Sequence, residues 1–275
     1  METAVARLAL FQHDPYCSRD CCAGITAALS GEHEIVLIGL RDLRLTILQQ
    51  FDLVIFPGGR GEASHFHTLF RHHIESVRSY VKRGGRYLGI CMGAYWADVH
   101  YFNLLHDLRC AQYITRPDAE IRRSYPTLSR IQWNGQNQTM YFFDGCTFVG
   151  DLAQTEVIAT YANGEPMAII QNNVGVIGCH PESEAHWYHS KALKRAWHEY
   201  RHHKLLLDFV NQMLGSDAKQ IILPQSEHKT SLDTVHDALQ NIVDLTAPFA
   251  RGTHQKVNSI AHTALVHIKQ MMEQI

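Results

Sequence analysis

The chain has 275 residues, of which 45% are hydrophobic and 19% charged, so a substantial core is expected and widespread disorder is not. Its formal net charge of −2 offers no basic surface for nucleic acid or for an anionic membrane. Seven cysteines without a disulfide-type spacing, no signal-peptide pattern and no apolar run of about 20 residues predict a cytoplasmic protein in a reducing setting.

The first third of the chain alternates short apolar runs with helical patterns. Strands are predicted at residues 4–11, 34–38, 53–56 and 86–90, and helices at residues 21–29 and 66–81. This alternation predicts an α/β fold with a mainly parallel sheet and helices on both faces. Functional sites in such folds gather at the carboxyl ends of the strands.

Between residues 108 and 178 the pattern changes to short β-like runs separated by turn signals such as Asn134-Gly135 and Asn163-Gly164. The runs cover residues 140–143, 156–161, 167–170 and 174–177. They predict antiparallel hairpins inserted in the sheet or added to its edge. A long helical region is predicted to follow at residues 184–214.

Three parts are predicted along the chain: a main domain at residues 1–215, a polar linker at 216–231 that carries Pro224, and a helical extension at 232–275. The extension has two amphipathic stripes, at residues 232–242 and 257–271, which predict a C-terminal helical hairpin. Such stripes must be buried, either by docking on the main domain or by self-association into a homo-oligomer.

A Gly-x-Cys-x-Gly run follows the strand predicted at residues 86–90. Gly89, Cys91 and Gly93 match a nucleophile elbow, in which the reactive side chain stands on a tight turn between a strand and a helix. A thiol at a helix N-terminus and near a histidine ionises more readily than a free thiol. Cys91 is therefore the predicted nucleophile; the alternative is a small buried side chain, as most free cysteines are.

A base and a carboxylate follow the apolar run at residues 174–177. In His180-Pro181-Glu182, the imidazole of His180 can accept a thiol proton and the carboxylate of Glu182 can fix the tautomer of the ring. The alternative is an ordinary polar strand end that Pro181 terminates. The position of this triplet after the last strand-like run favours the catalytic interpretation.

An oxyanion site is predicted at Pro57-Gly58-Gly59, which follows the strand at residues 53–56. Glycines let backbone N–H groups approach a substrate oxygen, so Gly58 and Gly59 would act together with the N–H of Met92. An ordinary Pro-Gly turn is the alternative.

No metal site and no cofactor are predicted. Cys17, Cys21 and Cys22 lie near His13, but their spacing matches none of the familiar zinc patterns. Most of the 19 histidines are expected at the surface, and the i,i+4 pair of His198 and His202 lacks a carboxylate or third ligand nearby.

Three motifs together resemble the class I glutamine amidotransferase-like superfamily: Pro57-Gly58-Gly59, the run at residues 84–95, and His180-Pro181-Glu182. Within it, the sequence resembles in particular the domain at the N-terminus of eukaryotic biotin–protein ligases, which also occurs as a free-standing bacterial protein. The resemblance spans about residues 5–214. It implies a flavodoxin-like three-layer sandwich and a triad of Cys91, His180 and Glu182.

Two departures from the family pattern bear on activity. In glutamine amidotransferases the elbow usually continues into a glutamine that shapes the substrate pocket, whereas Tyr95 stands at that place here and is assigned to substrate binding. Glutamine is therefore in doubt as the substrate, and without a synthase domain ammonia would need a separate acceptor enzyme. A biotin-ligase catalytic domain with its adenylate loop is also missing, so biotinylation is not expected.

Three functions follow from these residues. The first is a cysteine-dependent hydrolase or amidotransferase-like enzyme that acts on a small-molecule amide or acyl group through a thioacyl intermediate at Cys91. The second is a non-catalytic module that retains the pocket and binds a ligand or a protein partner. The third is a stress protein with an oxidisable Cys91, against which the His-Pro-Glu triplet argues.

Overall fold

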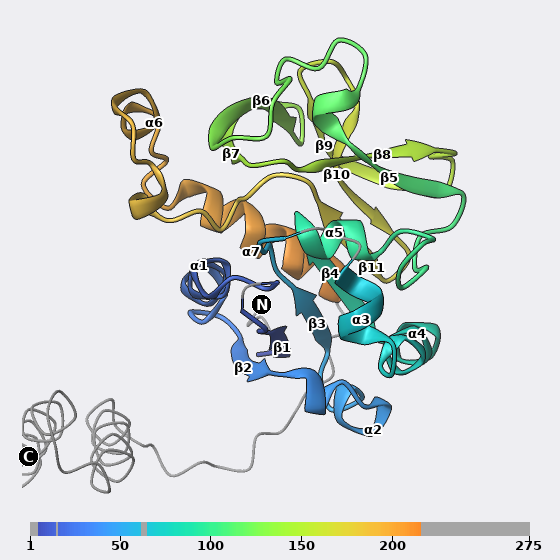
Figure 1. Ribbon diagram of the computed structural model, residues 1–275. Coiled ribbons are helices and arrows are strands. Elements are labelled where there is room, and N and C mark those ends of the chain that lie inside the picture. Colours follow the sequence, from blue (N-terminus) through green and yellow to red (C-terminus); the bar gives the residue numbers. More distant parts are fainter. Residues whose placement is uncertain (1–4, 15, 62–64, 216–275) are drawn as a thin grey trace, which may run out of the picture. The chain divides into compact units, whose positions relative to one another are not determined.

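The structure is a computed structural model that describes residues 5–14, 16–61 and 65–215 (Figure 1). The predicted linker at 216–231 and the predicted helical hairpin at 232–275 lie outside the described residues. Within those ranges, none of the helices combines the length and the apolar character needed to span a bilayer.

A nine-stranded sheet in the order β2-β1-β3-β4-β11-β10-β9-β6-β7 forms the centre of the fold. The strands from β2 to β11 pair in parallel, and those from β11 to β7 pair antiparallel. The bounds are β1 Arg7–Phe11, β2 Glu34–Ile38, β3 Leu53–Phe56, β4 Arg86–Ile90, β6 Thr127–Trp133, β7 Gln136–Phe142, β9 Glu156–Tyr161, β10 Pro166–Gln171 and β11 Val174–Ile177. The predicted α/β fold is confirmed, and the antiparallel strands extend one edge of the parallel part.

A smaller antiparallel pair, β5 (Leu108–Gln112) with β8 (Cys146–Gly150), forms a second sheet. β5, β6 and β8 were not predicted from the sequence. Figure 1 shows β5 to β10 gathered as one β-rich region on the far side of β4 and β11. Cys110 and Gln112 of β5 and Tyr141 of β7 line the same cavity as Cys91.

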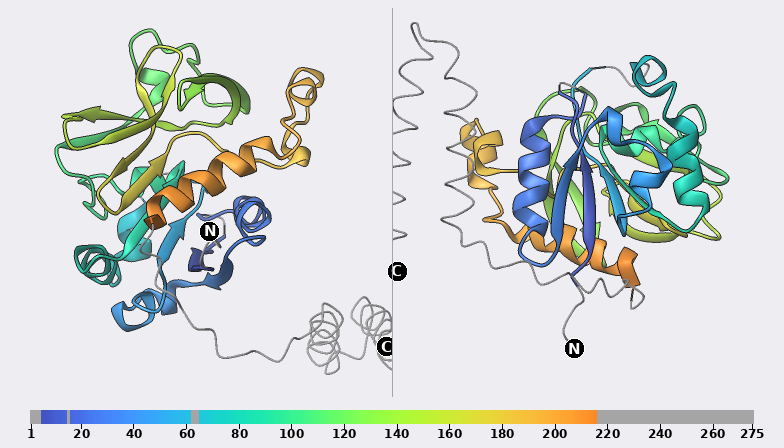
Figure 2. Two further views of the ribbon diagram at one scale, coloured as in Figure 1. Left: turned by 180° about the vertical axis from the view of Figure 1, so that it is seen from behind. Right: turned by 90° about the horizontal axis from the view of Figure 1, so that it is seen from below.

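Helices cover both faces of the parallel strands. α1 (Arg19–Leu29) and α7 (Arg201–Leu214) pack together against one face. The other face is covered by α3 (Phe66–Phe70), α4 (Ile74–Lys82) and α5 (Met92–Trp96), with the short α2 (Leu45–Leu48) beside α4. The right-hand view of Figure 2 shows α1 and α4 on opposite sides of the strands. The predicted sandwich is therefore confirmed.

The side chains of β1 and β3 explain the three layers. In β1, Leu8 and Leu10 belong to the core beneath α1 and α7, whereas Ala9 and Phe11 belong to the core on the opposite face. Successive side chains of a strand point to opposite faces, so a strand that is apolar throughout must be covered on both sides. All four residues of β3 are buried, as expected for a central parallel strand.

Two predicted helices were wrong in extent. The single helix predicted at residues 66–81 is divided into α3 and α4 by a turn at residues 71–73. The helical region predicted at 184–214 contains a 3-10 turn (Ala185–Trp187), α6 (Lys191–Arg195) and α7. Glu199 and Tyr200 have φ angles of 48° and 65°, which a right-handed helix does not accommodate. Further 3-10 turns lie at Leu40–Asp42 and Tyr113–Thr115.

Candidate active site

Cys91 lies on the tight turn between β4 and α5. Its backbone has φ 50° and ψ −104°, a conformation that residues with a side chain rarely adopt. A Cβ added at Gly89 would meet the backbone of Gly93, and one added at Gly93 would meet the carbonyl group of Phe56. The two glycines are therefore required because the turn packs closely on itself and on the end of β3.

The end of β11 brings His180 to the elbow. The Cys91 N–H donates to the Ile177 carbonyl oxygen at 2.8 Å, and the His180 N–H donates to the Tyr141 carbonyl oxygen at 3.0 Å. These bonds fix the main chain on both sides of the cysteine–histidine pair. His180 thus lies at the carboxyl end of β11, beside the carboxyl end of β4.

Glu182 lies behind the imidazole of His180. The distance from His180 Nδ1 to Glu182 Oε1 is 2.9 Å, and the two residues are 4% and 0% exposed. Burial alone would lower the pKa of His180, but the charge of Glu182 and the neighbouring thiols outweigh it and raise this pKa well above its usual value. The arrangement favours a charged imidazole held by a buried carboxylate.

The thiol of Cys91 has two neighbours of different kinds. It donates to the Phe143 carbonyl oxygen at 3.5 Å. It also interacts with the imidazole of His180 closely enough to raise the pKa of that ring. Cys91, His180 and Glu182 therefore occur together, in that order from the cavity inward.

A cavity of about 1060 Å³ opens onto this group, and Gly59, Met92 and Tyr95 line it together with Cys91 and His180. Gly58 lies at the His180 ring, because a Cβ added there would come 2.8 Å from Cε1 of that ring. The hydroxyl of Tyr95 donates to the Asp144 carbonyl oxygen at 3.2 Å, and burial raises its pKa, so it remains a neutral donor. The other lining residues include Asp20, Arg60, Asp98, His100, Arg109, Gln112, Asp144, His186, Trp187 and His189.

Cys21 also lies at this site, although its sequence position did not predict it. It lies in the first turn of α1, is 6% exposed, and hydrogen-bonds to His180. Burial raises its pKa to about 11, against the lowering effect of that bond. The Ser18 N–H donates to the Gly58 carbonyl oxygen at 3.0 Å and so fixes the start of α1 beside the loop after β3.

The other residues grouped with Cys21 in the sequence lie elsewhere. Cys17 belongs to the core beneath α3 and α5, and the Cys22 thiol donates to the Phe11 carbonyl oxygen at 3.6 Å. The topology of the fold could have identified Cys21. It lies in the first turn of the helix after β1, and therefore near the carboxyl ends of the parallel strands, where the elbow also lies.

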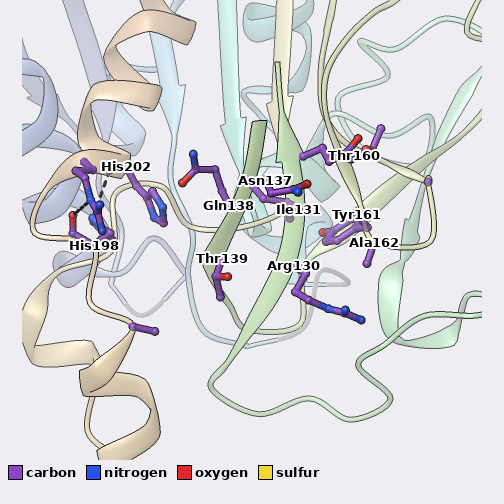
Figure 3. A pocket seen from close by; sticks show the side chains of 14 residues that line it. Arg130, Ile131, Asn137, Gln138, Thr139, Thr160, Tyr161, Ala162, His198 and His202 are labelled. Carbon is purple, nitrogen blue, oxygen red and sulfur yellow. Dashed lines mark hydrogen bonds between the residues drawn. The ribbon is translucent and has the colours of Figure 1, made fainter. Parts of the chain in front are cut away.

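A second pocket, of about 670 Å³, lies between the start of α7 and the strands β6, β7 and β9 (Figure 3). His198 and His202 face it from one side and Arg130 and Thr139 from the other, and it contains none of the predicted site residues. The expectation of surface histidines was wrong here, because His198, His202 and His203 are all buried. Burial lowers the pKa of His198 to about 3 and that of His202 to about 4.

Part of the chain matches a described protein family. Residues 15–103, which include Cys21, the loop after β3 and the elbow, match the family described as "Biotin-protein ligase, N terminal". The chain carries a biotin–protein ligase N-terminal-like region. No curated protein sequence matches the chain.

Solved structures extend the likeness beyond the biotin–protein ligase N-terminal-like region. A glutamine amidotransferase from Thermotoga maritima is similar with a TM-score of 0.55 and 12% identity, over 77% of this chain and 99% of that one. PurLQS from Thermotoga maritima is similar with a TM-score of 0.52 and 15% identity, over 75% of this chain and 100% of that one. At these identities the likeness shows the fold alone, which is similar to that of these two proteins.

Proposed function

We propose that the protein is a cysteine-dependent hydrolase or amidotransferase-like enzyme that acts on a small-molecule amide or related acyl group. The contact of His180 with both Glu182 and Cys91 carries this proposal. A nucleophile, a base and a group that orients the base are the parts that acyl transfer through a thiol requires. The glutamine amidotransferase-like fold supports an amide substrate by analogy.

The proposed reaction begins after the Cys91 thiol has passed its proton to His180: the thiolate sulfur attacks the carbonyl carbon, and the carbonyl π electrons move to oxygen. The N–H groups of Gly59 and Met92, at the cavity wall, would stabilise the resulting oxyanion. When the tetrahedral intermediate collapses, the C–N bond breaks and the leaving amine takes a proton from His180. A thioester at Cys91 remains.

The second half of the reaction returns the protein to its starting state. Water, or an acceptor amine, attacks the thioester while His180 accepts a proton from it. The C–S bond then breaks, the acid or new amide leaves, and the Cys91 thiolate is regenerated. Glu182 would hold the imidazole in orientation through both steps.

The alternative is a non-catalytic module that retains the cavity and binds a ligand or a protein partner. The bond from the Cys91 thiol to the Phe143 carbonyl oxygen favours it, because that bond holds the thiol as a proton donor. Tyr95 also stands at the position where glutamine amidotransferases usually carry a glutamine. The two functions differ in the reactivity of one sulfur atom.

The test measures how fast Cys91 reacts. Full-length protein is treated with iodoacetamide and, separately, with an activated acyl ester, and modification of the Cys91 peptide is followed by mass spectrometry across pH. The variants are His180→Ala and, as a matched control, His186→Ala, which changes an exposed histidine at the same cavity. Cys91→Ala defines the background from the other cysteines.

We expect His180→Ala to slow both reactions at least about tenfold and His186→Ala to leave them unchanged. Acylation should be followed by loss of the acyl group in the native protein. A Cys91 that resists both reagents, or reacts equally fast without His180, would exclude the enzyme and favour the binding module.

A further inference from the structure

A second set of donor atoms includes both the histidine and the glutamate of the proposed active site. One ligand atom each from Cys21, His180 and Glu182 lies within 4.8 Å of the others, and all three residues are buried. Ligands that bind one zinc ion tetrahedrally at about 2.0–2.3 Å lie roughly 3.3–3.8 Å apart, so side-chain movements of up to about 1 Å would bring these donors into range. No other group of this kind occurs among the residues that the structure describes.

The carboxylate of Glu182 has an unused oxygen at this place. Oε1 is bonded to His180, whereas Oε2 is buried and has no hydrogen-bond partner. A buried acceptor without a partner costs about 1–3 kcal/mol, and more when it is charged. A bound cation would give Glu182 the partner that it lacks.

The charges of the three donors also suit a divalent cation. A thiolate at Cys21, a neutral imidazole at His180 and a carboxylate at Glu182 sum to −2, so the occupied site would be neutral. Neutrality matters because an uncompensated charge in a buried site is strongly unfavourable. Sulfur, nitrogen and oxygen donors in one set are typical of zinc.

We propose that Cys21, His180 and Glu182 form an inhibitory site for a zinc-type divalent cation. On binding, the S–H bond of Cys21 breaks and the charged imidazole of His180 gives up one of its two ring protons; sulfur–metal and nitrogen–metal bonds form, and both protons pass to solvent. Three protein ligands leave a fourth position for water, and the cavity that Cys21 and His180 line provides the entry path.

Metal binding removes the base that Cys91 would use, and this consequence rests on the proposed function. If the cation takes Nδ1 of His180, neutral imidazole carries its proton on Nε2; if it takes Nε2, that lone pair is occupied. In both cases the ring cannot accept the thiol proton. Metal occupancy and catalysis at Cys91 therefore exclude each other.

The test uses Co²⁺ as a spectroscopic substitute for Zn²⁺ in the full chain, reduced and free of oxygen. A thiolate ligand gives a charge-transfer band, and tetrahedral Co²⁺ gives intense visible bands. Cys21→Ser removes the proposed sulfur ligand. Cys22→Ser is the matched control, because Cys22 is the next residue of α1 but its thiol is bonded to Phe11. Glu182→Gln is a second ligand variant, and far-ultraviolet circular dichroism checks that each variant folds.

We expect the native protein to show the thiolate band, Cys21→Ser to lose it, Glu182→Gln to need at least tenfold more Co²⁺, and Cys22→Ser to behave as the native protein. Cys91→Ala should keep the band, so the metal site can be judged even if Cys91 is not a nucleophile. Zn²⁺ should slow alkylation of Cys91 at least tenfold in the native protein and not in Cys21→Ser. A missing band, or a band that survives in Cys21→Ser, would overturn the proposal.

Discussion

Nδ1 of His180 and Oε1 of Glu182 lie 2.9 Å apart, on residues separated only by Pro181. Because both belong to one short loop after β11, local chain geometry sets this distance more than distant packing does. The bond favours the tautomer that carries its proton on Nδ1 and leaves Nε2 to accept one from a thiol. A His-x-Glu triplet therefore delivers an oriented base as a single unit.

Glu182→Gln is expected to slow acylation of Cys91 at least about tenfold, because an amide can orient the ring but cannot stabilise a charged imidazole. The rate is measured with an activated acyl ester on the full chain. Glu184→Gln is the matched control, since Glu184 lies 3.7 Å from His203 rather than at His180. Equal rates in the two variants would remove Glu182 from the mechanism.

The close packing at the elbow leads to a separate prediction about the free energy of unfolding. Gly93→Ala should lower the free energy of unfolding by about 3 kcal/mol, because the new methyl group would meet the Phe56 carbonyl group and force α5 away from β3. Gly31→Ala is the control: a Cβ there meets nothing within 4 Å, so a change within about 0.5 kcal/mol is expected. Urea denaturation of both variants measures the difference, and equal midpoints would contradict the close packing.

The sequence predicted the parallel half of the sheet and the elbow because both depend on local signals. The apolar run of β3 and the glycines around Cys91 follow from burial and from the steric demands of the turn. The breaks at residues 71–73 and at Tyr200 could not be predicted, since the apolar spacing continues across them.

The role of Cys21 was missed for a topological reason. Its contact with His180 joins residues 159 positions apart and depends on which helix begins beside which strand end. The amphipathic spacing of α1 gives no sign of this contact. By contrast, Cys91, His180 and Glu182 were predicted because the motifs that contain them resemble those of a known superfamily.

The buried histidines His198 and His202, beside the second pocket, predict that the folded protein becomes less stable in acid. Burial lowers the pKa of His198 to about 3 and that of His202 to about 4, whereas the unfolded chain binds these protons near pH 6.5. As the pH decreases, the unfolded state therefore binds these protons before the folded state does. The contribution of the two histidines to the free energy of unfolding is fully present above about pH 6.5 and is lost as the pH falls towards 4. At pH 5 the loss is on the order of 2 kcal/mol for each histidine.

His202→Gln should flatten this pH dependence relative to the native protein, as measured by urea denaturation between pH 7 and pH 5. His72→Gln, at an exposed position, should leave it unchanged. A native protein whose stability does not change over this interval would show that these histidines are protonated in the folded state as well.

The C-terminal residues 232–275, outside the described part of the chain, give the last prediction. Their two apolar stripes must be buried, because isolated helices of this length are only marginally stable in water. We expect them to form a hairpin that contributes to self-association, and the polar stretch at 216–231 gives enough reach for this.

Deleting residues 231–275 should then reduce the native assembly to a monomer, as measured by light scattering coupled to size exclusion. A full-length protein that is already monomeric, with the same state after deletion, would refute the association. Loss of solubility without a change in subunit number would instead indicate a hairpin docked on its own chain.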